Sequence, residues 1–174
     1  MKNAFAKFTF VIVLAFAVSV SAQSNCEILP VNAPLLLNLR LGMSPEEVRN
    51  AFGNALKIKI KKNGERIFFQ NYIKNPAPAA LKNVRALYLR FYDRKLYQIE
   101  LFYEPRTDLP NLESIAQTLA AQLNFLPENW QIKNARANLS CGENSLKADN
   151  ILNPHIELTN ETTRRIVEEK RKQK

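Results

Sequence analysis

The sequence predicts a single α+β domain in which an antiparallel β-sheet, built from hairpins, is covered on one face by two helices. Residues 84–103 alternate apolar and polar side chains in two arms around a polar turn, the pattern of a β-hairpin. A second alternating pair flanks Asn63-Gly64, a dipeptide typical of tight hairpin turns. Helical spacing follows helix-start signals at 45–52 and 110–124. Because an isolated two-stranded ribbon is unstable, we expect both hairpins to share one sheet beneath the helices.

Residues 1–22 have the pattern of a secretory signal peptide. Lys2 and Lys7 precede an apolar run over 8–20, and small residues allow cleavage after Ala22. The run is 13 residues long, short of the roughly 18 expected of a membrane-spanning helix. We therefore expect a secreted or periplasmic protein with no integral membrane segment after cleavage.

The remaining 152 residues are enough for one domain with a hydrophobic core, and their net charge is +7. The predicted organisation after the signal peptide is an irregular N-terminal arm over 23–38, the α+β domain over 39–160, and a charged C-terminal helix or tail over 161–174.

Cys26 and Cys141 are the two cysteines of the chain. In an exported protein an even pair is most simply a disulfide, here closing a long loop, and chain-entropy estimates value such a closure at about 4–5 kcal/mol. The alternative, a redox or metal-binding thiol pair, lacks CxxC spacing and has one histidine, His155, to add to it.

The first helix has a complete set of start and stop signals. Ser44 is a suitable N-cap, Pro45 occupies the first helical position and Glu47 completes a capping box. Gly53 ends the helix, and its apolar residues fall on one face that would cover a sheet.

One face of the first hairpin is predicted to be basic. With a two-residue turn at Asn63-Gly64, Ile60 pairs with Ile67 and Ile58 pairs with Phe69 on the apolar face. The opposite face is then predicted to carry a basic stripe that the second hairpin extends if it is adjacent, comprising Lys57, Lys59, Lys61, Arg66, Phe68 and Arg90.

In the second hairpin the register follows from burial. A three-residue loop over 93–95 pairs Leu87 with Leu101, Leu89 with Ile99 and Phe91 with Tyr97. A two-residue turn would set both leucines opposite polar residues, and burying each leucine contributes about 1.5–3 kcal/mol. We therefore expect an odd-numbered loop.

The rest of the chain repeats a loose helix-then-strands pattern. Asp108 is the expected cap of the second helix, and Pro110 the expected start. Three short strands are predicted over 130–141, 145–152 and 155–159.

Two of these segments together resemble a known class of exported proteins. Residues 41–48, LGMSPEEV, lead to Gly53, and LRFYDRKL follows over 89–96. This pattern is similar to the β-lactamase-inhibitor-like superfamily and to the small lipoprotein of the outer-membrane assembly machinery, over about residues 39–103. The resemblance implies a helix-covered antiparallel sheet and binding of a protein, and it transfers no catalytic residue. The chain departs from it in lacking a lipidation cysteine and in having Arg94 where glycine is usual.

The motifs of common enzymes are missing from the sequence. Histidine-dependent catalysis has only His155 available, within an expected strand, and there is no phosphate loop, HExxH motif or metal-ligand spacing. We expect no enzymatic activity, no cofactor and no metal; the alternative is a small secreted hydrolase or transferase with a site at His155 or a carboxylate cleft.

The basic stripe predicts the class of partner. It suits an acidic protein, an anionic cell-wall polymer or a lipid headgroup, with an attraction that salt weakens. The competing interpretations are a solvated sheet face and a lysine-guarded edge strand. An exported chain has little access to nucleic acid, so the sequence predicts a non-catalytic binding or structural module that engages a protein or an anionic envelope partner.

Overall fold

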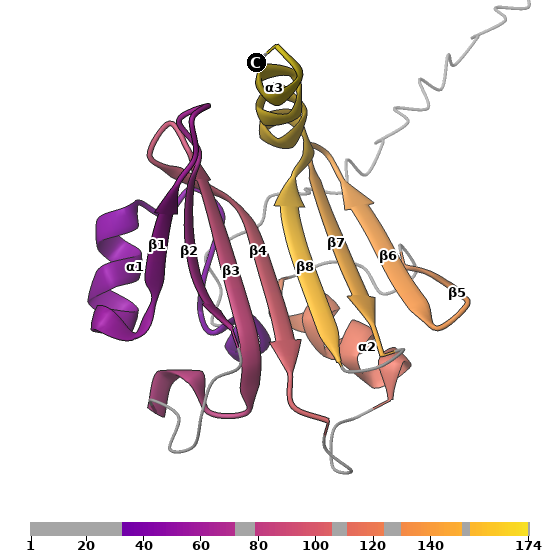
Figure 1. Ribbon diagram of the computed structural model, residues 1–174. Coiled ribbons are helices and arrows are strands. Elements are labelled where there is room, and N and C mark those ends of the chain that lie inside the picture. The colour runs from indigo at the N-terminus through magenta and orange to yellow at the C-terminus, as the bar shows by residue number, and fades with distance from the viewer. Residues whose placement is uncertain (1–32, 72–78, 106–110, 124–129, 151–153, 174) are drawn as a thin grey trace, which may run out of the picture.

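A computed structural model describes residues 33–71, 79–105, 111–123, 130–150 and 154–173 of the 174-residue chain. The predicted signal peptide, Cys26, Asp108 and Pro110 lie outside the described residues. In the described part the chain forms an eight-stranded antiparallel sheet with three α-helices (Figure 1). The α+β class and the antiparallel sheet are therefore confirmed.

The sheet has the strand order β1-β2-β3-β4-β8-β7-β6-β5. Helix α1 precedes β1–β4 and helix α2 precedes β5–β8, and the two four-stranded halves join through their last strands, β4 and β8. The element bounds are α1 Pro45–Phe52, β1 Lys57–Ile60, β2 Arg66–Asn71, β3 Val84–Tyr92, β4 Lys95–Tyr103, α2 Leu112–Gln122, β5 Gln131–Lys133, β6 Arg136–Cys141, β7 Asn144–Asp149, β8 His155–Asn160 and α3 Glu161–Lys172, with short 3-10 helices η1 Pro34–Leu36, η2 Gly53–Ala55 and η3 Ala79–Leu81.

One face of the sheet holds the hydrophobic core. Strand alternation places Phe68, Leu89 and Ile99 in line across β2, β3 and β4. The same core cluster includes Val48 of α1 and Leu119 of α2. Figure 1 shows α2 behind β8 and β7, and α3 at the upper end of the sheet. We refer to the face opposite the core as the outer face.

The N-caps of α1 and α2 can be compared with the caps predicted from the sequence. The capping box of α1 is present, with Glu47 N donating to Ser44 Oγ at 3.2 Å and Ser44 N donating to Glu47 Oε2 at 2.7 Å. Helix α2 is capped by Asn111, whose Oδ1 accepts from Ser114 N at 2.9 Å. The prediction of Asp108 as that cap was wrong, because Asn111 already provides the acceptor for the first turn.

The β3–β4 hairpin keeps the predicted pairs by a different route. Leu87 lies opposite Leu101, and Leu89 opposite Ile99, as predicted. The three-residue loop was wrong: Tyr92 pairs with Lys95 across a two-residue turn at Asp93-Arg94, where both φ angles are positive, as type I′ turns require. A register shift then pairs Phe91 with Leu96 instead of Tyr97. This bulge absorbs the extra residue, so both leucines stay in the core.

The β1–β2 hairpin is shifted by one residue from its prediction. Ile58 lies opposite Phe68, and Ile60 opposite Arg66, because β2 must also place Phe68 against Leu89 of β3. The loop lengthens accordingly, and Gly64, with a φ of 86°, donates to Lys61 O at 3.0 Å. The expected burial of the two isoleucines was wrong: β1 is an edge strand, where Ile58 is 45% and Ile60 is 68% exposed.

Candidate functional site

The register divides the six residues of the predicted basic stripe between two faces. Lys59 lies opposite Ile67, which lies opposite Arg90, so Lys57, Lys59 and Arg90 share the outer face. Arg66 and Phe68 point to the other side, and Phe68 is buried in the core at 1% exposure. Their assignment to the stripe was therefore wrong, since it followed from the incorrect hairpin register. Lys61 is exposed directly after β1.

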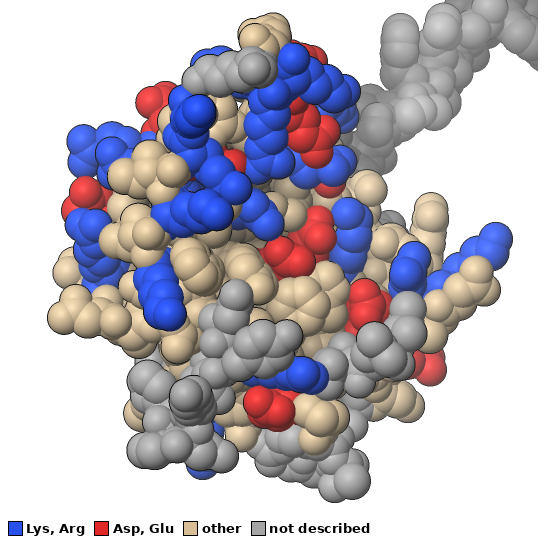
Figure 2. All heavy atoms as spheres, viewed as in Figure 1, with Lys and Arg blue, Asp and Glu red and all other residues tan. Residues whose placement is uncertain are grey.

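Helix α3 adds cations that the sequence analysis did not include. Lys170 contacts the ring of Tyr92 at 4.9 Å and donates to its hydroxyl. A hollow of about 490 Å³ lies between the helix end and the first hairpin loop, lined by Lys62, Asn63, Gly64, Lys170 and Gln173. We define the basic rim as the exposed lysines of β1, of the β1–β2 loop and of the end of α3. They are Lys57, Lys59, Lys61, Lys62, Lys170 and Lys172. Figure 2 shows Lys and Arg gathered over the upper part of this face.

The end of α3 is held to the sheet by a buried carboxylate. Glu65 is 0% exposed and accepts from Arg171 Nη2 at 2.7 and 2.6 Å and from the Tyr97 hydroxyl at 2.7 Å. Arg90 Nη1 lies 3.7 Å from the same carboxylate. Burial and the hydrogen bond to Glu65 raise the pKa of Tyr97. These contacts hold the end of α3, and with it the rim lysines of this helix, against the sheet. The burial of a glutamate was not apparent from the sequence.

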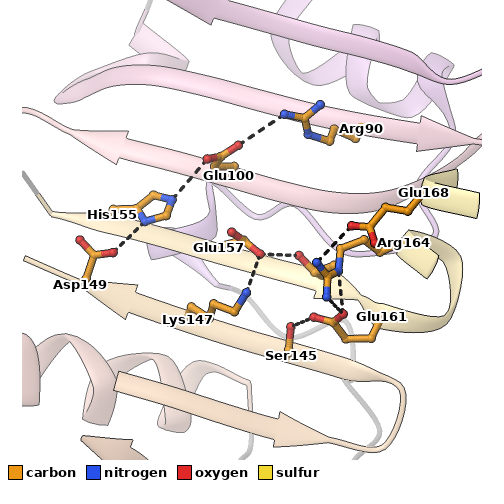
Figure 3. Close-up of polar contacts among 11 residues, drawn as sticks. Arg90, Glu100, Ser145, Lys147, Asp149, His155, Glu157, Glu161, Arg164 and Glu168 are labelled. Atoms are coloured by element: carbon orange, nitrogen blue, oxygen red, sulfur yellow. Dashed lines mark hydrogen bonds and ion pairs between the residues drawn. The ribbon is translucent and has the colours of Figure 1, made fainter. Parts of the chain in front are cut away.

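A charged network crosses the middle of the outer face (Figure 3). Its centre is His155 at the start of β8, whose Nδ1 lies 3.1 Å from Asp149 Oδ2 and whose Nε2 lies 3.6 Å from Glu100 Oε1. Glu100 Oε2 in turn lies 3.9 Å from Arg90 Nη2. Glu100 lies opposite Tyr88 in the β3–β4 hairpin. Its proximity to His155 depends on the pairing of β4 with β8, which joins segments distant in the sequence.

Burial and the neighbouring charges shift the pKa of His155 in opposite directions. Desolvation favours the neutral ring, but Glu100 and Asp149 outweigh it, so that the pKa of His155 lies above its ordinary value. The ring also stacks on Phe102, with centroids 4.4 Å apart and planes 17° apart. These contacts fix the ring plane and give each ring nitrogen a carboxylate neighbour.

The network continues from β8 towards α3. Glu157 Oε1 accepts from Lys147 Nζ at 3.2 Å and from the Thr159 hydroxyl at 3.1 Å. Arg164 bonds Glu161 at 2.7 Å, and Glu161 also accepts from Ser145 at 2.5 Å. A pocket of about 240 Å³ lies between α3 and the strands here, and its lining includes Arg90, Lys147, Glu157 and Arg164.

This arrangement does not match that of a nucleophile and its base. In the described part of the chain both His155 nitrogens face carboxylates, and no serine, threonine or cysteine is bonded to the ring. Of possible metal ligands among the described residues, Glu100, His155 and Glu157 each offer an atom within 4.8 Å of the others.

No family model, curated protein or solved structure matches this chain. Within the described segments, no helix has the length and apolar character needed to cross a membrane.

Cys141 ends β6 at 4% exposure. Its predicted disulfide partner, Cys26, lies outside the described residues, so the disulfide stays a prediction.

His155 gives a test of the network by pH. The pKa of His155 is raised in the folded, metal-free protein. The stabilisation that the charged ring gives is therefore complete below the unfolded pKa of about 6.5. It is lost as the pH rises through the folded pKa. In urea unfolding with a chelator present, the gap in unfolding free energy between the wild type and His155→Gln is expected to shrink with rising pH. A gap that is constant across the neutral range would contradict the ion pairing of His155.

Proposed function

We propose that this protein is an exported, non-catalytic binding module whose basic rim engages an acidic protein surface or an anionic envelope polymer. The observation that carries the proposal is the meeting of the β1–β2 loop with the end of α3, which gathers lysines from two distant segments around one hollow. Export with cleavage after Ala22, the Cys26–Cys141 disulfide and the resemblance to exported binding proteins are parts of the same proposal. Coverage of one sheet face by two helices also belongs to it, supported by the core residues of α1 and α2.

The charges around the hollow differ from those of the network on the outer face. Arg90, Lys147, Arg164 and Arg171 all lie within 4 Å of a carboxylate. By contrast, the described residues that line the hollow include two lysines and no carboxylate. Net positive potential is therefore concentrated at the rim, where it attracts an anionic surface and falls with ionic strength.

Charge reversal at the rim tests this proposal. We expect Lys59→Glu/Lys62→Glu/Lys170→Glu to elute from immobilised poly-glutamate at much lower salt than the wild type. The matched control is Lys82→Glu/Lys133→Glu/Arg136→Glu, which changes the net charge equally at exposed sites outside the rim. Anionic-lipid vesicles, used as a second probe, distinguish a membrane surface from an acidic polypeptide.

If the two triple variants elute together, the attraction reflects net charge alone and the rim is not a binding site.

An intact mass with and without reductant checks the disulfide independently, since reduction of one bond adds about 2 Da. The alternative hydrolase or transferase at His155 is less well supported, because in the described part of the chain no hydroxyl or thiol is bonded to the His155 ring.

A further inference from the structure

We infer that Glu100, His155 and Glu157 form a binding site for a divalent transition-metal ion of the Zn²⁺ type on the outer face of the sheet. The inference is independent of the basic rim, which lies on other elements.

The register brings the three side chains together. Glu100 of β4 lies directly opposite Glu157 of β8, and His155 precedes Glu157 by two residues, so that all three project from the same face. Like charges directly opposite one another destabilise a sheet. A cation between the two carboxylates would remove that penalty.

Each of the three residues keeps an atom available for coordination. His155 Nε2 is buried and has no hydrogen-bond partner among the described residues. Among the described residues, the cationic groups nearest to Glu100 are His155 Nε2, 3.6 Å from Oε1, and Arg90 Nη2, 3.9 Å from Oε2, both beyond the usual hydrogen-bond distance. Both hydrogen bonds that Glu157 makes within the described segments are accepted by Oε1, which leaves Oε2. One ligand atom from each residue lies within 4.8 Å of the other two, so modest side-chain movement brings them to bonding distance.

Asp149 supplies the support that metal-binding histidines usually have. Its Oδ2 lies 3.1 Å from His155 Nδ1, so Nδ1–H donates to the carboxylate and the lone pair is left on Nε2, the nitrogen on the side of Glu100. Stacking on Phe102 holds the ring in that orientation.

The donor set selects the class of ion. One imidazole and two carboxylates suit Zn²⁺ and neighbouring transition metals better than Mg²⁺ or Ca²⁺, which prefer oxygen ligands alone. Three protein ligands leave a coordination position for water or another ligand. Glu157 also lines the 240 Å³ pocket together with Arg90, Lys147 and Arg164, so an anion is the ligand that this position would favour.

The competing interpretation is a metal-free ion-pair network, with a protonated His155 bridging Asp149 and Glu100. The two interpretations are separated by titrating the oxidised, tag-free mature protein with Zn²⁺ at about pH 8, since alkaline conditions favour the deprotonated ring that a metal ion requires. We expect one Zn²⁺ per chain by calorimetry and native mass spectrometry. His155→Ala and the isosteric Glu157→Gln should abolish binding, and Asp149→Asn should weaken it about 10–100-fold.

Glu143→Gln, at an exposed turn carboxylate, is the matched control and should bind as the wild type does. Because the chain has one histidine, its ring signals in NMR report directly whether added Co²⁺ sits at this site, even in a variant of lowered stability. No uptake of Zn²⁺ by the wild type, or uptake that survives His155→Ala, would overturn the inference.

Discussion

Replacing Phe68 with alanine is expected to lower the free energy of unfolding by about 3–5 kcal/mol, the usual cost of truncating a buried aromatic residue. Phe68 is 1% exposed, and its ring centroid lies 4.9 Å from that of Phe91 in the core. Arg49 of α1 lies over the same ring at 5.5 Å, so the cavity would open between helix and sheet. Urea unfolding monitored by circular dichroism measures the loss.

The neighbouring residue is the matched control. Phe69 points to the outer face, is partly exposed and stacks on Tyr88 with centroids 6.4 Å apart. Phe69→Ala is expected to cost only about 1 kcal/mol, the scale of a cross-strand aromatic pair. The register predicted from the sequence reverses this order, because it sets Phe69 in the core and Phe68 on the surface. A larger loss at Phe69 than at Phe68 would therefore restore the predicted register.

Local signals determined the elements that the sequence predicted well. The capping box at Ser44 and Glu47 needs only four adjacent residues, and the structure contains it. The alternation over 84–103 likewise defines two strands whose leucines pair as expected. In both cases the interacting residues are close in sequence, so one segment contains the whole argument.

The errors arose where a third strand or a helix decides the outcome. Asn63-Gly64 favours a tight turn, but β2 is also bound to β3, and burial of Phe68 against Leu89 outweighs the turn preference. Ile58 and Ile60 look like core residues by period alone, yet their exposure follows from the edge position of β1. Strand order is a tertiary property that alternation does not encode.

The candidate sites show the same limit. The predicted strand over 155–159 implies by alternation that His155 and Glu157 share one face. Glu100 joins them only through the pairing of β4 with β8. Similarly, the lysines near Asn63 were recognised as basic, whereas their proximity to Lys170 depends on where α3 lies on the sheet.

Substituting Arg171 with methionine is expected to destabilise the protein by about 3 kcal/mol, at the low end of the range for removing the partner of a buried charge. The substitution keeps much of the side chain's volume but leaves the Glu65 carboxylate, which is 0% exposed, with the Tyr97 hydroxyl and a more distant Arg90. The last turn of α3 should loosen as well, so amide hydrogen exchange near 168–172 is expected to accelerate beyond the global change.

The neighbouring Lys172→Met removes an exposed cation and should change stability by no more than about 0.5 kcal/mol. The decisive comparison is the double variant Glu65→Leu/Arg171→Met, which removes the buried charge together with its partner. If the cost of Arg171→Met comes from an uncompensated carboxylate, the double variant should be more stable than the single one, because apolar replacement of a whole buried pair is often neutral. If the two losses simply add, Glu65 and Arg171 do not act as a pair, and another contact must hold α3, and with it the basic rim, against the sheet.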